Sequence, residues 1–378
     1  MFEFLIAGIS TPWALLVFTG FTVGVVGGFI GVGGGYMVTP ALVVFGFPGH
    51  MAAGIDITHI AGKGVIASIR HRQLGNIDWT LAMTVVSGTM FGVEMGVRIL
   101  DYFKEQGLST VAVLTASFIL MTGLFIYTQY ETRSAARQTA KLESEGHDIG
   151  REVVATDLPR HLQRIPLAPI IRLRTARVVI SLWVIVLVGM FTGTLAGFLG
   201  VGGGFIAVPA LVYLIGATTH VAVGSDLVQI IFSGSYGALR HTMEGNVDFL
   251  AVMFMLCGAV FGAQFGSIAT AYVRGPAIRF ILSYSLALAG LGALFPLINQ
   301  LTGSSIPLLS ALAVTLTLGQ MIFLCTYILS LLTFALLARR GRWVPIWALP
   351  FLVRYPVARS RPVQAAQAVP VQEVGGER

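Results

Sequence analysis

Three ionisable residues follow one another at helical spacing within an otherwise apolar stretch. Asp56, His59 and Lys63 are separated by steps of three and four residues, so a helix over 51–70 would place them on one face. An ammonium group can hold an anion, an imidazole changes charge near neutral pH, and a carboxylate can carry a proton or pair with the lysine. The pattern therefore predicts either a proton-coupled anion site or an internal ion pair that only fixes helix packing.

Two glycine runs are the second chemical feature. Residues 31–35 read Gly-Val-Gly-Gly-Gly, and residues 200–204 repeat that sequence. Each glycine costs a helix about 1 kcal/mol relative to alanine, so a helix should break at each run. The apolar segments that follow, 36–47 and 205–216, reach only about 18 Å as helices, too short for a hydrocarbon core of roughly 30 Å. Both are predicted to be half-helices of the re-entrant kind.

Paired breaks of this kind favour the binding of an anion. Irregular backbone at membrane depth is tolerated only inside protein or beside a water-filled cavity, and matching breaks in two halves indicate a transporter's binding site. Exposed glycine N–H groups and the positive end of a half-helix both attract negative charge. The residues expected to bind the substrate are Gly33, Gly34, Gly35, Gly202, Gly203, Gly204, Lys63, His59, Ser225 and Gln229. The alternative, that the glycines only permit close helix packing, explains Gly20, Gly24 and Gly28 better than the runs themselves.

The acid of the first helix recurs in the second half of the chain, but its neighbours do not. Asp226 matches Asp56, whereas a glutamine and a serine stand where the histidine and lysine were. Asp56, Asp226 and Glu94 are the residues expected to couple transport to protons, because ionisable groups inside spans are costly and usually functional. Glu94 aligns with Gln264 and is expected to face the interior. Each aspartate can instead cap a helix, and Ser225 can be an N-cap.

An internal repeat must position these residues. Residues 20–42 and 189–211 are identical at 12 of 23 positions, and 50–79 agrees with 220–249 at 11 of 30. Agreement over this length indicates a duplicated unit of about 120 residues. The expected parts are a first transmembrane repeat (1–130), a basic cytoplasmic connecting segment (131–177), a second repeat (178–298), an extra C-terminal transmembrane helix (299–339) and a basic cytoplasmic tail (340–378).

Composition places the whole chain in a membrane. Of its 378 residues, 55% are hydrophobic and 11% charged, whereas a soluble domain carries about 25% charged residues. The long uncharged runs lack the alternation of a β-barrel, so the predicted fold is all-α and polytopic. No nucleotide-binding, nucleophile-elbow or metal-ligand spacing occurs, and Cys257 and Cys325 lie far apart in apolar runs. We therefore expect no enzyme activity, no cofactor and no metal.

Basic residues predict the orientation. Nine Lys/Arg residues fall within 131–177 and seven within 339–378, and clusters beside spans usually stay in the cytoplasm. If each unit crosses an odd number of times, the two units are inverted, with Arg70 inside and its counterpart Arg240 outside. The alternative, binding of nucleic acid or anionic lipid, is weaker because no aromatic residues interleave with the basic ones. The expected location is the bacterial inner membrane.

The doubled glycine motif resembles that of the TauE/SafE family of sulfite and organosulfonate exporters. It reads Gly-Gly-Phe-Ile-Gly-Val-Gly-Gly-Gly at 27–35 and Gly-Phe-Leu-Gly-Val-Gly-Gly-Gly at 197–204, each followed by Pro-Ala-Leu, and Gly-Asn-x-Asp turns recur at 75–78 and 245–248. This resemblance implies export of a small sulfur-containing anion by secondary transport. Two alternatives stay open, a passive anion channel and a non-transporting assembly or receptor subunit. The oligomeric state stays open as well.

Overall fold

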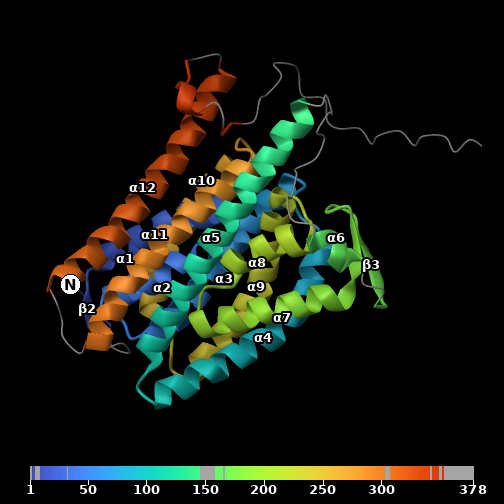
Figure 1. Cartoon of the computed structure of the whole chain (residues 1–378). Helices are drawn as coiled ribbons and strands as arrows, with labels where there is room; N and C mark the ends of the chain where they lie inside the picture. Colours follow the sequence, from blue (N-terminus) through green and yellow to red (C-terminus); the bar gives the residue numbers. More distant parts are fainter. Residues whose placement is uncertain are drawn as a thin grey trace, which may run out of the picture.

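The computed structural model is almost entirely helical and describes residues 2–4, 9–31, 33–144, 158–164, 167–302, 307–340, 343–348 and 351–352 (Figure 1). The first unit contains α1 (Trp13–Ile30), α2 (Gly35–Val44), α3 (Gly49–Gln73), α4 (Trp79–Glu105) and α5 (Ser109–Ser144). The second contains α7 (Leu182–Leu199), α8 (Gly204–Ala210) with a π-helical turn η1 (Leu211–Ile215), α9 (Thr219–Met243), α10 (Phe249–Thr270) and α11 (Gly275–Thr302). The remaining elements are β1 (Phe2–Phe4), β2 (Ile9–Thr11), α6 (Leu158–Gln163), β3 (Ile170–Leu173), β4 (Val178–Ser181), α12 (Pro307–Arg339) and the 3-10 turn η2 (Ile346–Ala348).

Both helices break at the glycine runs. Helix α1 ends at Gly31, and Gly31, Gly33 and Gly34 all have positive φ, a conformation that side chains other than glycine's rarely adopt. The chain then folds back, because a Cβ added to Gly34 would lie 2.7 Å from the backbone oxygen of Val23, well before the end of α1. The second run repeats this geometry, with positive φ over Gly200, Gly202 and Gly203. Each break is followed by the short helix that the sequence predicts.

Glycines spaced four apart pack α1 against α10 and α7 against α4. Added Cβ atoms on Gly20, Gly24 and Gly28 would collide with backbone atoms at successive positions 255, 259 and 263 of α10. Glycines of α7 meet backbone of α4 in the same order. Each of these pairs joins one unit to the other, and in each pair the two chains run in the same direction. The small-residue spacing therefore serves close packing, as membrane helices require.

Equivalent helices of the two units run in opposite directions where they touch. In the centre, Gly64 of α3 lies beside Ile230 of α9, whereas Ile57 lies beside Gly237 further along. Helices α5 and α11 also pack together. The two units therefore interlock across the middle of the molecule instead of standing side by side as separate bundles.

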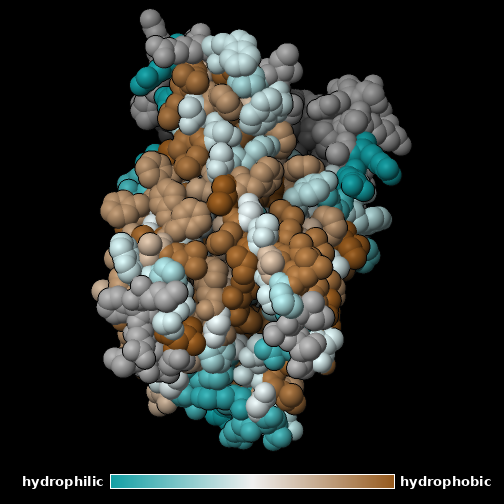
Figure 2. Space-filling model, turned by 90° about the vertical axis from the view of Figure 1, so that its left-hand side faces the viewer, coloured by the Kyte–Doolittle hydropathy of each residue, from teal (hydrophilic) through white to brown (hydrophobic). Residues whose placement is uncertain are grey.

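Seven helices of the described part are long and apolar enough to cross a membrane: α1, α4, α5, α7, α10, α11 and α12. Figure 2 shows a broad apolar belt on one flank of the bundle, with polar side chains gathered toward its ends. Helices α3 and α9, which carry the candidate site, are not among these seven; each buries one side in the bundle and leaves Ile69 or Leu239 more than half exposed on the other.

The described residues of the connecting segment include regular secondary structure. Helix α5 continues to Ser144, well past the expected end of the first repeat at residue 130, and α6 and the β3–β4 hairpin follow. Two small two-stranded sheets, β1–β2 and β3–β4, accompany the helices, and the fold is otherwise helical, as the all-α prediction requires. Positions 145–157 and 165–166, and the tail from 353 onward, lie outside the described residues.

The turn between α3 and α4 ties this hairpin to the helices. Asp78 caps α4 by accepting a 3.1 Å hydrogen bond at Oδ1 from the backbone N–H of Leu81. Its Oδ2 atom accepts hydrogen bonds from the backbone N–H groups of Thr175 (2.8 Å) and Ala176 (3.1 Å) in the hairpin. Asp248 caps α10 in the same way, but its Oδ2 has no hydrogen-bond partner among the described residues.

This difference gives a test with a built-in control. Asp78→Ala should lower the free energy of unfolding by about 2–4 kcal/mol, since it removes a cap and leaves the N–H groups of Thr175 and buried Ala176 without their acceptor. Asp248→Ala should cost only about 1 kcal/mol, the value of a cap. Thermal unfolding of the purified variants measures this, and tryptic cleavage within 172–177 should accelerate only in Asp78→Ala. Equal costs and equal cleavage would show that the hairpin is not held by Asp78.

Candidate functional site

Asp56, His59 and Lys63 of α3 form a hydrogen-bonded chain inside the protein. Nζ of Lys63 lies 3.0 Å from Nε2 of His59, and Nδ1 of His59 lies 2.8 Å from the backbone oxygen of Asp56 and 3.3 Å from its Oδ1. All three side chains are buried. Because the lysine can only donate, these contacts assign His59 as the neutral tautomer that carries its proton on Nδ1. The hydrogen bond from Nδ1 therefore ends on the backbone of Asp56, whereas Oδ1 lies within ion-pair distance but accepts no hydrogen bond among the described residues.

Asp56 connects α3 to both half-helix regions. Its Oδ2 accepts a 2.8 Å hydrogen bond from the hydroxyl of Thr39 in α2, and the same hydroxyl lies 3.0 Å from the backbone oxygen of Leu199 at the end of α7. Its Oδ1 lies 2.9 Å from where a Cβ of Gly35 would stand, at the start of α2. The protein's own carboxylate therefore sits at the positive end of this half-helix.

The two glycine runs meet each other at the centre. A Cβ on Gly35 would lie 2.8 Å from Cα of Val201, so the backbones of the two breaks are in contact. The side chain of Ile60 fills the space between them, since its Cγ2 would lie 2.9 Å from a Cβ on Gly33 and 3.0 Å from one on Gly202. Gly34 and Gly203 lie one step away, each turned against its preceding helix. Gly204 begins α8.

Each break also rests on the central helix of the other unit. Gly31 packs against Val223 of α9, and Gly200 packs against the backbone of Ala53 of α3. These two contacts are equivalent in the repeat. The polar chain of α3 and both glycine runs thus form one continuous region, which we call the central site: the chain of Asp56, His59 and Lys63 together with residues 33–35 and 201–204.

The second unit places an isolated acid at the position of Asp56. Asp226 is buried, and neither of its carboxylate oxygens has a hydrogen-bond partner among the described residues. One turn further, Nε2 of Gln229 donates to the hydroxyl of Ser233 over 2.6 Å. An ionised carboxylate without partners is very costly in a dry interior, so this environment favours a bound proton or cation on Asp226.

Two predicted site residues lie outside this arrangement. The hydroxyl of Ser225 accepts a 2.9 Å hydrogen bond from the backbone N–H of Asp78, so it joins α9 to the α3–α4 turn. Glu94 is paired with Arg98 at 2.8 Å and with Arg240 at 2.7 Å, and it accepts a hydrogen bond from Tyr236. With a side chain 24% exposed, Glu94 does not face the interior as expected, because two arginines draw it to the boundary between α4 and α9.

Sequence reasoning missed several contributors to the central site. Thr39 has no counterpart in the second repeat, where valine stands at position 208, so the duplicated pattern did not mark it. Ile60 looked like an ordinary apolar residue, although Ile230 matches it in the repeat. His71 and His241 also match, and the Nε2 of His241 lies 2.9 Å from the backbone oxygen of Gly197 in the last turn of α7.

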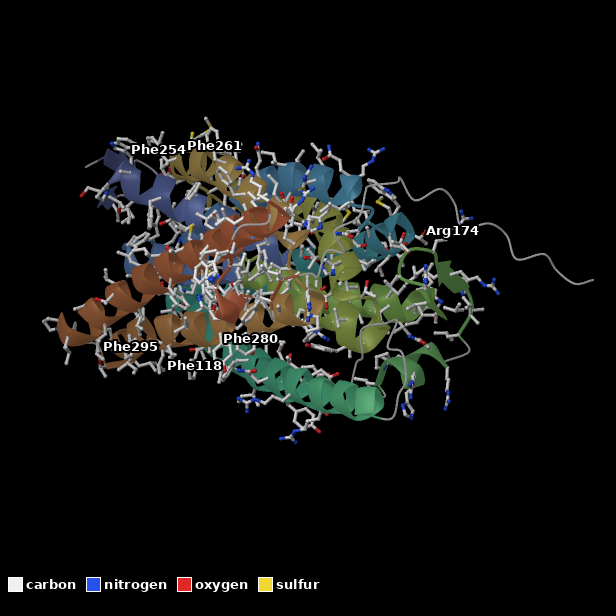
Figure 3. All side chains as sticks on the ribbon, turned by 90° about the horizontal axis from the view of Figure 1, so that it is seen from above. Phe118, Arg174, Phe254, Phe261, Phe280 and Phe295 are labelled. Atoms are coloured by element: carbon white, nitrogen blue, oxygen red, sulfur yellow. The ribbon has the colours of Figure 1, made fainter. Side chains whose placement is uncertain are left out.

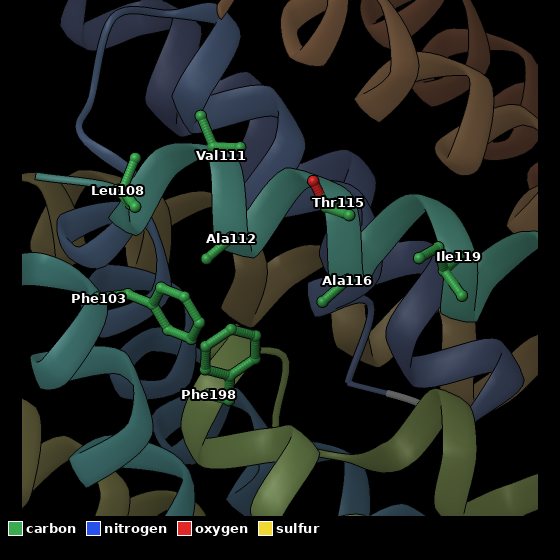
Figure 4. Close-up of a pocket in the computed structure, with 8 residues that line it drawn as sticks. All are labelled: Phe103, Leu108, Val111, Ala112, Thr115, Ala116, Ile119 and Phe198. Atoms are coloured by element: carbon green, nitrogen blue, oxygen red, sulfur yellow. The ribbon is translucent and has the colours of Figure 1, made fainter. Parts of the chain in front are cut away.

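Apolar grooves occur on the surface, away from the central site. One has a volume of about 390 Å³ and lies between α4, α5 and the end of α7 (Figure 4). Its lining is Phe103, Leu108, Val111, Ala112, Thr115, Ala116, Ile119 and Phe198. A single hydroxyl group and no charge make this groove suited to hydrocarbon and unsuited to a small anion.

Comparisons with known proteins agree on one family. A family model described as "Sulfite exporter TauE/SafE" matches residues 16–293. The probable membrane transporter protein YunE of Bacillus subtilis (strain 168) is 23% identical, over 74% of this chain and 96% of its own length. The probable membrane transporter protein MJ0441 of Methanocaldococcus jannaschii is 22% identical, over 73% of this chain and 93% of its own. No solved structure matches the chain.

Proposed function

Because the chain belongs to the sulfite exporter TauE/SafE family, and is therefore a multi-pass membrane protein of a transporter family, we propose that it exports a small sulfur-containing anion by secondary transport. The proposed substrates are sulfite and organosulfonates, and the proposed location is the bacterial inner membrane. The observation that carries the proposal is the meeting of two broken helices at Asp56 and Ile60 of α3, the helix whose buried Lys63 is bonded to His59 one turn further along. The proposed substrate anion binds between Lys63 and the N–H groups of the two glycine runs.

The start of α2 supports a negatively charged guest. The first N–H groups of a helix have no acceptor within that helix, and the helix dipole adds partial positive charge. In this structure Asp56 occupies the neighbourhood of that end, while Ile60 fills the gap between the breaks. Binding of the anion therefore requires Ile60 to move and the charge of Asp56 to be neutralised, for example by a proton that arrives through His59.

The opposed directions of equivalent helices support alternating access between inverted units. Helix α9 meets α3 running the other way, as expected for two units related by a rotation about an axis in the membrane plane. The ion pair of Glu94 with Arg240 fastens α4 to α9, whereas the matching positions, Gln264 and Arg70, cannot form one. An ion pair therefore holds the two helices together at the Glu94 boundary of the site, whereas the equivalent boundary at Gln264 has none. Such a difference fits a transport cycle in which the two boundaries open at different steps.

Proton coupling follows from placing an acid and an anion in one dry site. A bound anion disfavours an ionised carboxylate nearby, so the anion and the proton each raise the affinity of the site for the other. The coupling residues we propose are Asp56, Asp226 and, at the outer boundary, Glu94. The anion and its proton would cross in the same direction, which the sum of the proton gradient and the substrate gradient selects, so export requires the substrate gradient to outweigh an opposing proton gradient.

Flux measurements in proteoliposomes test this function. The purified protein would be screened with sulfite, sulfate, thiosulfate, sulfoacetate and carboxylates at two pH values. We expect saturable flux of a sulfur-containing anion that is accelerated by the same anion on the opposite side of the membrane. Large unitary currents without such counterflow would indicate a channel, and the absence of flux for every anion would remove the proposal.

Asp226→Asn tests the coupling step alone. The amide cannot release a proton but keeps the size and most of the polarity of the acid, so a pH gradient should no longer drive net flux, while exchange of anion for anion continues. Asp101→Asn, on α4 next to Asn246, serves as the control and should keep the wild-type response. If Asp226→Asn still concentrates substrate against its gradient when a pH gradient is applied, Asp226 does not carry the coupling proton.

A further inference from the structure

The connecting segment presents a basic surface at one end of the bundle. Arg164 follows α6, Arg172 lies on β3, and Arg174 and Arg177 flank the hairpin turn, and all four side chains are exposed. No aspartate or glutamate occurs between residues 158 and 181 to balance them. Figure 3 shows Arg174 on the hairpin, beyond the ends of the long helices in that view. Asp78 of the α3–α4 turn contacts the hairpin backbone, so the arginines leave this surface with a net positive charge.

Apolar side chains lie among these arginines on the outer face of the hairpin. In the β3–β4 register Arg172 stands opposite Val179, and both are exposed, whereas Leu173 and Val178 opposite each other are buried. Val179 is 48% exposed and Ile170 is 56% exposed. A surface that combines guanidinium groups with protruding aliphatic side chains resembles interfacial membrane-binding elements more than a solvated loop.

The position of the hairpin fixes its height relative to the membrane. Strand β4 ends at Ser181 and α7, a candidate membrane span, begins at the next residue. Trp183, in the first turn of α7, is 47% exposed and donates a 3.0 Å hydrogen bond from its indole N–H to the backbone oxygen of Ala168. Tryptophan at the end of a span marks the headgroup level, so the hairpin lies at that level as well.

We propose that this surface, comprising Ile170, Arg172, Arg174, Arg177 and Val179, binds the headgroups of anionic phospholipids in the cytoplasmic leaflet. The guanidinium groups pair with phosphate and the aliphatic side chains enter the boundary of the acyl region. Nucleic acid fits less well, because Trp183 is the single aromatic residue of the described hairpin region and its indole N–H is already bonded to protein. Asp78 clamps the hairpin to the α3–α4 turn, so a bound lipid would also brace that turn.

Titration with soluble lipids tests the proposal independently of any transported substrate. Detergent-solubilised full-length protein would be titrated with dioctanoylphosphatidylglycerol and with dioctanoylphosphatidylcholine, and binding followed by native mass spectrometry and thermal shift. Each basic residue near a lipid surface strengthens binding by roughly fivefold, so the triple variant R172Q/R174Q/R177Q should bind the anionic lipid roughly 100-fold more weakly. High salt should likewise weaken the binding of the anionic lipid to the wild-type protein, because salt screens the attraction between arginine and phosphate.

The matched control removes three exposed arginines elsewhere, R98Q/R274Q/R340Q. It should lose much less affinity than the hairpin variant; equal losses, or no loss in either, would overturn the proposal. A DNA oligonucleotide that binds through the hairpin arginines more tightly than the anionic lipid would overturn it as well.

In nanodiscs, an environment-sensitive dye on Val179→Cys, in a Cys257→Ala background, should emit further to the blue with phosphatidylglycerol than with phosphatidylcholine. Identical emission in both would contradict membrane contact.

Discussion

Lys63→Met is expected to weaken anion transport strongly at low substrate concentration while the protein still folds. Lys63 is the only lysine or arginine of α3 that the structure buries, and its removal takes away the positive charge proposed to attract the anion. A hydrogen bond to a charged group contributes about 1.5–3 kcal/mol, so the affinity for the anion should fall by about 10- to 100-fold. Counterflow in proteoliposomes, with the substrate found by the screen above, measures this loss.

A double variant separates this role from simple packing. If Lys63 served only to neutralise Asp56 within the bundle, Asp56→Asn combined with Lys63→Met would remove both charges together, and transport should return, since replacing a whole buried ion pair is often nearly neutral. If Lys63 holds the substrate, the double variant stays inactive although its thermal stability recovers. Full transport by the single variant Lys63→Met would instead exclude the lysine from the site.

The sequence predicted those features of the fold that depend on residues close together in the chain. Glycine content alone located both breaks, because four glycines in five residues cannot sustain a helix. Spacing predicted the contacts of Gly20, Gly24 and Gly28, since small residues four apart share one face of a helix. The duplicated pattern supplied the order of the elements, and steps of three and four residues put Asp56, His59 and Lys63 together on one face.

Contacts between the two units could not be predicted in that way. Nothing in the neighbourhood of Ile60 indicates that it separates the two glycine runs, because the residues it touches are far away in the chain. The same holds for the hydrogen bond between Thr39 and Asp56, which requires α2 to return beside α3 after the break. For Glu94, the expectation of an inward position failed because its partner Arg240 lies in the other unit and offers a stronger interaction at the surface.

The contact between Gly200 and Ala53 is the second place where a large effect is expected. A Cβ on Gly200 would collide with the backbone oxygen, carbonyl carbon and Cα of Ala53, and none of these atoms can move as the tip of a flexible side chain can. Gly200 also has φ of 75°, where alanine is strained by about 1–2 kcal/mol. With the overpacking added, Gly200→Ala should destabilise the protein by about 3–5 kcal/mol and open the joint between α3 and the second break.

Gly245→Ala is the matched control for that substitution. Gly245 has φ of 68°, almost the same as Gly200, but no atom lies within 4 Å of an added Cβ. Gly245→Ala should introduce conformational strain without a collision. We therefore expect a slightly lower unfolding temperature and normal transport. Because the two glycines share a backbone conformation, the difference between their variants measures how strongly the second break depends on its contact with α3. Similar unfolding temperatures and similar flux in both would mean that the two units are not held together at this joint.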